Sequence, residues 1–144
     1  MLEIKNVAVL GTGVMGSQIA AHCANAGLNV YAFDMNQEIS ESGIEKATKI
    51  KPKAFYDKKD VSLIKCYNYD EHLDKLKECD WVIEVIAERL DWKKDLYNKI
   101  TPFIKNQIVT SNTSGISLAE LSEDMEESLK KNFFIQTFLI HRDI

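Results

Sequence analysis

Cysteine and proline are scarce in this sequence, and their scarcity limits what the chain can be. The three cysteines, Cys23, Cys66 and Cys79, are an odd number at irregular spacing, which matches neither a disulfide framework nor a zinc site. We therefore expect reduced thiols, no bound metal and a cytoplasmic protein. The two prolines, Pro52 and Pro102, each interrupt a local pattern, and neither lies in a low-complexity linker.

Long apolar runs and an excess of basic charge are also missing. No run of about 18 apolar residues occurs, so we expect no transmembrane helix. Residues 1–5 carry charge where a secretory signal would be apolar. The formal net charge of −4 leaves no basic field to attract nucleic acid or an anionic membrane. We therefore expect neither a nucleic-acid partner nor a membrane partner.

What the sequence does contain is an alternation of apolar strands and helical patterns. Its 144 residues, 45% of them hydrophobic, suffice for one domain with one core. Such alternation implies parallel strands joined by right-handed crossovers. The expected fold class is therefore α/β, a Rossmann-type doubly wound, mainly parallel sheet with helices on both faces. The expected strands are residues 4–10, 28–33, 62–66, 81–85 and 108–110, and the expected helices are residues 15–26, 37–50, 69–77, 91–105 and 118–129.

A glycine turn links the first expected strand to the first expected helix. Its sequence has the form G-x-G-x-x-G, in which Gly11 allows a tight turn, Gly13 lets a diphosphate approach the backbone, and Gly16 lets helix and strand pack closely. The free N–H groups at the start of the helix then face the phosphates at its positive end. We predict that the whole turn binds a dinucleotide; it consists of Gly11, Thr12, Gly13, Val14, Met15 and Gly16.

Asp34 follows the second expected strand, about twenty residues beyond the turn, where the dinucleotide-binding pattern has an acidic residue. Its carboxylate can accept hydrogen bonds from the hydroxyls of an adenosine ribose, and it would repel a 2′-phosphate. The pattern therefore predicts NAD as the cofactor in preference to NADP. The alternative is that the glycines only mark turns and that Asp34 is a solvated charge, but a strand, a helix and a carboxylate in register disfavour it.

Three blocks of sequence together resemble a known family. The first covers residues 7–34 and holds Gly-Thr-Gly-Val-Met-Gly, the second is Asp-Trp-Val-Ile-Glu-Val-Ile-Ala-Glu at residues 80–88 followed by Lys93, and the third is Ser-Asn-Thr-Ser at residues 111–114. Over residues 3–134 the chain resembles the N-terminal, NAD-binding domain of the 3-hydroxyacyl-CoA dehydrogenase family. The first block is shared with several other hydroxyacid dehydrogenase families, whereas the second and third in combination are more specific.

The resemblance implies roles for three residues beyond the turn. In the family, the residue matching Glu88 lies near the nicotinamide, the one matching Lys93 also contacts NAD, and the one matching Ser114 borders the nicotinamide and the substrate 3-hydroxyl. Ser114 is therefore expected to serve in catalysis as well as in cofactor binding. Two alternatives stay open: Glu88 and Lys93 can be an exposed, solvated pair at a helix start, and Ser114 or Ser117 can be the N-cap of the following helix.

The resemblance fails shortly after Phe134. The family continues with a motif resembling Phe-x-Gly-x-His-Phe-Phe-Asn-Pro, whose histidine is the general base. In this chain Ile135 replaces the glycine, and Thr137 stands where the histidine is expected. His141 lies four positions late and is not expected to act as the base.

We expect residues 1–134 to form the NAD-binding domain and residues 135–144 to form an anomalous tail. One DNA sequence that can encode residues 138–144 reads Phe-Asn-Pro-Pro-Arg-Tyr in a neighbouring reading frame. This peptide is close to the Phe-Asn-Pro with which the family's motif continues. A frameshift after Phe134 and a truncated product are therefore expected. The family's helical C-terminal domain, which completes the acyl-CoA site and the homodimer, would then be absent, and the oligomeric state of this chain stays open.

The sequence thus predicts the NAD(H)-binding domain of a 3-hydroxyacyl-CoA dehydrogenase, which oxidises 3-hydroxyacyl-CoA to 3-oxoacyl-CoA in fatty acid β-oxidation. In the family a histidine, oriented by a glutamate, removes the 3-hydroxyl proton while hydride passes to the nicotinamide. Because the chain retains the cofactor half but neither member of that pair, we expect NAD binding with little or no turnover. Two alternatives remain: another β-hydroxyacid dehydrogenase, and a catalytically silent nucleotide-binding or structural module.

Overall fold

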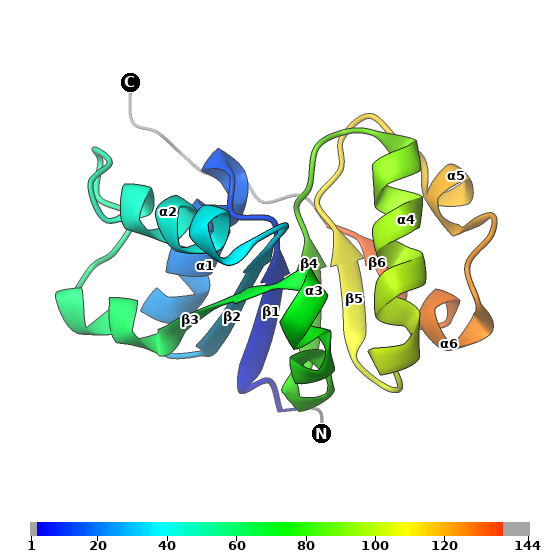
Figure 1. The fold of residues 1–144 in the computed structure, drawn as a ribbon, viewed down its shortest axis with the longest axis horizontal. Helices are drawn as coiled ribbons and strands as arrows, with labels where there is room; N and C mark the ends of the chain where they lie inside the picture. Colours follow the sequence, from blue (N-terminus) through cyan, green and yellow to red (C-terminus); the bar gives the residue numbers. More distant parts are fainter. Residues whose placement is uncertain (1–2, 137–144) are drawn as a thin grey trace.

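The computed structural model of the chain describes residues 3–136 and contains a six-stranded parallel sheet (Figure 1). The strand order is β3-β2-β1-β4-β5-β6, so the sheet is built outward from β1 in both directions. The strands are β1 (Asn6–Leu10), β2 (Asn29–Asp34), β3 (Ile64–Asn68), β4 (Trp81–Glu84), β5 (Ile108–Ser111) and β6 (Phe133–Ile135).

Helices pack on both faces of this sheet, and Figure 1 shows α1 and α2 on one side of the molecule and α4, α5 and α6 on the other. Within residues 3–136, no helix has both the length and the apolar character that a membrane crossing requires. The α-helices are α1 (Val14–Asn25), α2 (Gln37–Ala47), α3 (Tyr69–His72), α4 (Leu90–Ile100), α5 (Leu118–Ser122) and α6 (Glu127–Lys130), and the 3-10 helices are η1 (Lys58–Leu63), η2 (Leu73–Glu78) and η3 (Thr101–Phe103).

The central strand β1 is buried on both faces. Val7 and Val9 belong to the apolar cluster that includes α1 and α2, whereas Ala8 and Leu10 belong to the cluster that includes α4. Side chains of a strand alternate between the two faces of a sheet, so each face of β1 packs against its own helical layer. The arrangement confirms the doubly wound α/β fold that the sequence predicts.

Several boundaries differ from those expected. The helix expected over residues 91–105, with an early break or a bend at Pro102, is broken early: it ends at Ile100, because Pro102 has no N–H to continue it and lies in η3 instead. The strand expected over residues 62–66 begins only at Ile64, because the residues before it form η1. The helices expected over residues 69–77 and 118–129 are each divided in two, into α3 and η2 and into α5 and α6.

The short strand β6 is an element that the sequence pattern does not predict. It pairs in parallel with β5, and Ile135 is the partner of Ser111 at its end. Ile135, the first residue of the expected tail, therefore lies in the sheet. Thr137, His141 and the rest of residues 137–144 lie outside the described residues, so the frameshift stays a prediction.

Helix α2 begins with a side-chain cap, because Asn36 accepts a hydrogen bond from the Ile39 N–H at 2.8 Å. We predict that Asn36→Ala lowers the free energy of unfolding by about 1 kcal/mol, since the amide then loses its partner. Urea denaturation followed by circular dichroism measures this change. Lys58→Ala, at the exposed start of η1, is the control and should change stability by less than about 0.5 kcal/mol. Equal stability of both variants would contradict the capping role.

Candidate functional site

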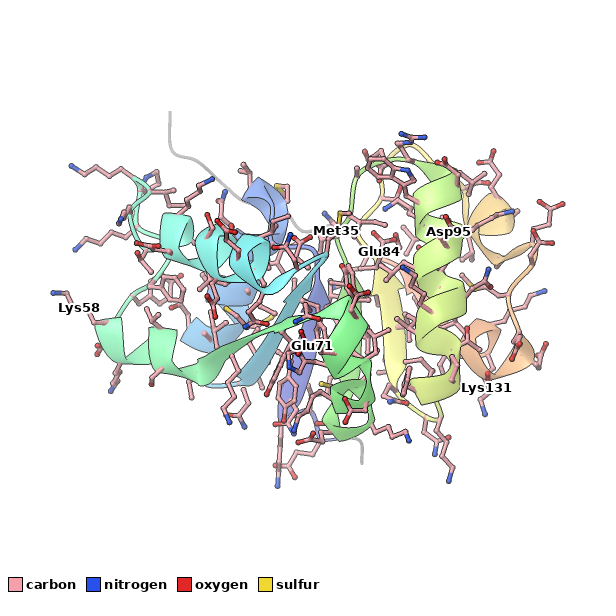
Figure 2. All side chains as sticks on the ribbon, in the orientation of Figure 1. Met35, Lys58, Glu71, Glu84, Asp95 and Lys131 are labelled. Carbon is pink, nitrogen blue, oxygen red and sulfur yellow. The ribbon has the colours of Figure 1, made fainter. Side chains whose placement is uncertain are left out.

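The candidate site lies at the carboxyl ends of the strands, where the strand order reverses between β1 and β4. In a doubly wound sheet the connections leave in opposite directions at this point and open a crevice between them. Figure 2 shows Met35 and Glu84 at this end of the sheet, with Asp95 on α4 at the same level. The glycine turn and the segments that follow β2, β4 and β5 form the walls of the crevice.

The glycine turn brings the end of β1 against the start of α1. Gly11 has a φ of 110°, which favours glycine, and its N–H donates to the Phe33 carbonyl at 2.8 Å. A Cβ on Gly11 would stand 2.7 Å from the Val85 carbonyl oxygen, and a Cβ on Gly16 would overlap the Gly11 carbonyl. The close crossing of β1 and α1 therefore requires glycine at Gly16, and the approach of the segment after β4 requires it at Gly11.

The first amides of α1 point toward open space. The helix has Gly13 as its N-cap, without a side-chain cap and without an acidic residue in its first turn. The first helical bond runs from the Ser17 N–H to the Gly13 carbonyl at 2.9 Å, so the N–H groups of Val14, Met15 and Gly16 have no acceptor in the helix. A Cβ on Gly13 would meet no atom within 4 Å. The positive end of the helix thus has free donors with room for a diphosphate.

Asp34 lies beside the turn at the end of β2. Its Oδ2 accepts from the Thr12 N–H at 2.8 Å and from the Thr12 hydroxyl at 3.0 Å, and its Oδ1 accepts from the Met35 N–H at 2.7 Å. These bonds fix the half-buried carboxylate against the turn, while Oδ1 can accept from a further donor. The structure therefore brings Asp34 and the glycine turn together, as the sequence pattern requires.

Three cavities meet at the turn, and Gly13 lines all of them. One, of about 460 Å³, extends over the ends of β4 and β5 past Glu88 and Ser114. A second, of about 420 Å³, lies toward α4 between Asp34 and Trp92. A third, of about 520 Å³, lies over α2. An extended ligand with phosphates at its middle therefore has room on both sides of Gly13.

Glu88 stands at the rim of the cavity that extends over β4 and β5. Its Oε2 accepts from the Thr113 hydroxyl at 2.7 Å and from the Gly115 N–H at 3.2 Å. Partial burial acts to raise the pKa of Glu88, but these hydrogen bonds and the charge of Lys93 outweigh burial and hold the pKa below its usual value of 4.5. The carboxylate is therefore ionised at neutral pH and hydrogen-bonded to the segment that follows β5.

Lys93 lies beneath this cavity and not among the residues that line it. Its side chain is 0% exposed, and its Nζ lies 2.6 Å from Glu84 Oε2 and 3.5 Å from Glu88 Oε1. The alternative of an exposed pair is therefore wrong for Lys93, and its contact with NAD stays a prediction. The sequence pattern did not reveal Glu84, whose one signal is an acidic residue within the apolar run at residues 82–86.

In the segment after β5, one serine caps helix α5 and another lines the cavity. Ser117 is the N-cap of α5 and forms a capping box with Glu120. Ser114 is not the cap; it is exposed and lines the same cavity as Glu88. The capping alternative is therefore right for Ser117, whereas the role of Ser114 near the nicotinamide stays a prediction.

A helix N-terminus with unpaired N–H groups, at the point where the strand order of a doubly wound sheet reverses, is typical of dinucleotide-binding domains. Within that class, the sequence pattern of the family described as 3-hydroxyacyl-CoA dehydrogenase, NAD binding domain, matches residues 6–139. The chain belongs to this family, and its cofactor is NAD. The match favours this family over the other β-hydroxyacid dehydrogenases.

Individual relatives agree with the family. A probable 3-hydroxyacyl-CoA dehydrogenase of Deinococcus radiodurans is 39% identical over 140 residues, covering 92% of this chain and 40% of that protein. A Rickettsia felis protein, named as a trifunctional enzyme of a fatty acid oxidation complex, is 40% identical over 146 residues, covering 94% of this chain and 20% of that protein. The (S)-3-hydroxybutyryl-CoA dehydrogenase structure from Ralstonia eutropha has a TM-score of 0.77 at 30% identity, covering 95% of this chain and 50% of that one. The chain thus spans less than half the length of these two curated relatives.

We predict that Gly13→Val weakens NADH binding without unfolding the protein. Its φ of −65° and the free space around its Cα accept a side chain, but that side chain fills the space above the helix amides. The affinity for NADH should fall by at least about tenfold, with a melting temperature within about 2 °C of the wild type.

Gly16→Ala is the contrasting variant, because its Cβ overlaps the Gly11 carbonyl and should lower the melting temperature. Titration calorimetry and thermal unfolding separate the two effects. Unchanged NADH affinity in Gly13→Val would place the cofactor elsewhere.

Proposed function

We propose that this chain is the cofactor-binding part of an NAD-dependent 3-hydroxyacyl-CoA dehydrogenase. The observation that carries the proposal is the meeting of three cavities at Gly13, with Asp34 on one side and Glu88 and Ser114 on the other. Bound NAD supplies a hydride acceptor for oxidation of the 3-hydroxyl of an acyl-CoA. The names of the relatives from Deinococcus radiodurans and Ralstonia eutropha support this substrate class.

Each end of the crevice has its own task in this proposal. Asp34 accepts hydrogen bonds from the adenosine ribose and repels a 2′-phosphate, and the helix amides donate to the diphosphate. Glu88 lies near the nicotinamide, Lys93 also contacts the cofactor, and Ser114 serves catalysis by a hydrogen bond near the substrate 3-hydroxyl. The proposed cofactor-binding set is Gly11, Thr12, Gly13, Val14, Met15, Gly16, Asp34, Glu88, Lys93 and Ser114.

Removal of the 3-hydroxyl proton requires a base. Among residues 3–136 the histidines are His22 on α1 and His72 on α3, and neither lines the three cavities at the turn. Positioned proton transfer contributes about 10²–10⁴-fold to a reaction rate. We therefore propose that the chain binds NAD and turns over hydroxyacyl-CoA slowly or not at all.

We also propose that the domain serves fatty acid β-oxidation in the cytoplasm. Cys23, Cys66 and Cys79 are unpaired, and burial raises the pKa of Cys23 to about 11 and that of Cys79 to about 12. Unreactive, unpaired thiols suit a reducing compartment. The name of the Rickettsia felis relative supports the metabolic role.

The first test of the proposal measures binding and turnover separately. We expect titration calorimetry to show one NADH bound per chain. Reduction of acetoacetyl-CoA by NADH should be at least about 100-fold slower than with a full-length relative, because no histidine among residues 3–136 lines the crevice to donate the proton. Robust turnover would refute the proposed loss of activity, and absence of NADH binding would refute the cofactor site.

A second test concerns the choice between NAD and NADP. We predict that the chain binds NADH at least about tenfold more tightly than NADPH, because a 2′-phosphate would face the Asp34 carboxylate. Asp34→Asn removes that charge and should lower the ratio of NADH affinity to NADPH affinity. Quenching of Trp92 fluorescence can report binding, because Trp92 lines the cavity next to Asp34.

The control for this test is Asp95→Asn, which removes the same charge from α4 in the same cavity. It should leave the ratio of NADH affinity to NADPH affinity unchanged. The hydrogen bonds from Thr12 of the glycine turn go to Asp34, and Asp95 does not contact this turn. An equal change in both variants would show that the preference comes from overall charge and not from Asp34.

A further inference from the structure

Helix α2 contains a glycine, Gly43, in its interior. Glycine costs about 1 kcal/mol relative to alanine at such a position. The backbone of Gly43 does not require glycine, because positive φ values occur among residues 3–136 only at Gly11 and Gly27. The reason lies outside the helix: a Cβ on Gly43 would overlap the Thr12 carbonyl oxygen and stand 2.6 Å from the Thr12 hydroxyl oxygen. Gly43 thus lets α2 pack directly on the glycine turn.

Thr12 lies at the centre of this contact and is buried. Its hydroxyl has one hydrogen and two acceptors within reach, Asp34 Oδ2 at 3.0 Å and the Ile39 carbonyl oxygen of α2 at 3.2 Å. The carboxylate is the stronger acceptor because it is charged. The Thr12 N–H donates to the same carboxylate oxygen at 2.8 Å. One residue of the turn therefore supplies two donors to Asp34 and joins it to α2.

These bonds set the orientation of the Asp34 carboxylate. Oδ2 faces Thr12, while Oδ1 accepts from the Met35 N–H at 2.7 Å and can accept from a further donor. The side chain is only half-buried, so without these donors it could turn toward water. A carboxylate that is already oriented loses less freedom when a ribose hydroxyl binds to it.

Space alone does not separate NAD from NADP at this place. Thr12, Asp34 and Gly43 all line the cavity of about 520 Å³ over α2, which has room for a phosphate group. The other charged residues of its lining are Glu38 and Lys46, whose charges are opposite. Rejection of a 2′-phosphate therefore depends on where the Asp34 carboxylate stands.

We propose that the Thr12 hydroxyl and Gly43 are positioning residues for the choice between NAD and NADP. Gly43 admits α2 to the turn, the packing holds the Thr12 side chain, and the Thr12 hydroxyl fixes the Asp34 carboxylate toward the adenosine ribose. This inference rests on the cofactor site proposed above. Loss of the hydroxyl should weaken binding of NADH more than binding of NADPH, because a displaced carboxylate serves the ribose less well and repels a 2′-phosphate less.

The test is Thr12→Val, which replaces the hydroxyl with a methyl group of similar size and keeps the bond from the Thr12 N–H. We expect titration calorimetry to show NADH affinity lower by about fivefold and NADPH affinity within about twofold of the wild type. Thr12→Ser keeps a hydroxyl and should retain both affinities. Thr48→Val is the matched control and should also retain both, because the Thr48 hydroxyl bonds the Glu45 carbonyl at the far end of α2.

Gly43→Ala tests the same contact from the side of α2. Its Cβ must displace the Thr12 side chain, so the folded variant should also lose NADH affinity selectively. If this variant does not fold, Thr12→Val still provides the test, because it adds no heavy atom to the contact. Full retention of NADH affinity in folded Gly43→Ala would refute the role of Gly43.

A structural role alone predicts a different result from a positioning role. NADH and NADPH share the diphosphate that the turn binds, so a loosened turn would weaken both equally. Equal loss of both in folded Thr12→Val, or unchanged affinity for both, would overturn the inference, and so would a selective loss of NADH in Thr12→Ser. Failure of the wild type to bind either dinucleotide would instead refute the cofactor site itself.

Discussion

The close crossing of β1 and α1 is the constraint on which the rest of the site depends. Because Gly16 packs on the Gly11 carbonyl, the helix starts directly at the carboxyl end of the central strand. Its first amides then face the crevice without a capping side chain. A helix start with free donors and a positive dipole end is a site for a diphosphate, so one steric contact determines both the local fold and the ligand class.

In the proposed site, the two ends of the dinucleotide lie on opposite sides of that helix start. The end of β2 brings Asp34 to the turn on one side, and the ends of β4 and β5 bring Glu88 and Ser114 on the other. The carboxyl ends of parallel strands share one edge of the sheet, so residues far apart in sequence meet there. The buried Glu84–Lys93 pair belongs only to the second side.

The turn and Asp34 could be predicted from sequence because their chemistry follows from local spacing after single strands. The burial of Lys93 could not, because it depends on partners from β4, β5 and α4 that only the tertiary structure brings together. Charged side chains at a helix start are usually solvated, and the pattern alone favoured that alternative. The strand β6 was missed because three residues are too few for a periodic signal, and its position depends on pairing with β5.

A titration of the isotope-labelled chain with NADH, followed residue by residue through its backbone amide resonances, tests the placement of the cofactor most directly. The geometry predicts the largest changes at the amides of Val14, Met15 and Gly16, where the helix has donors without acceptors. Changes confined to the opposite end of the sheet, around Gln107, with the turn unaffected, would contradict it.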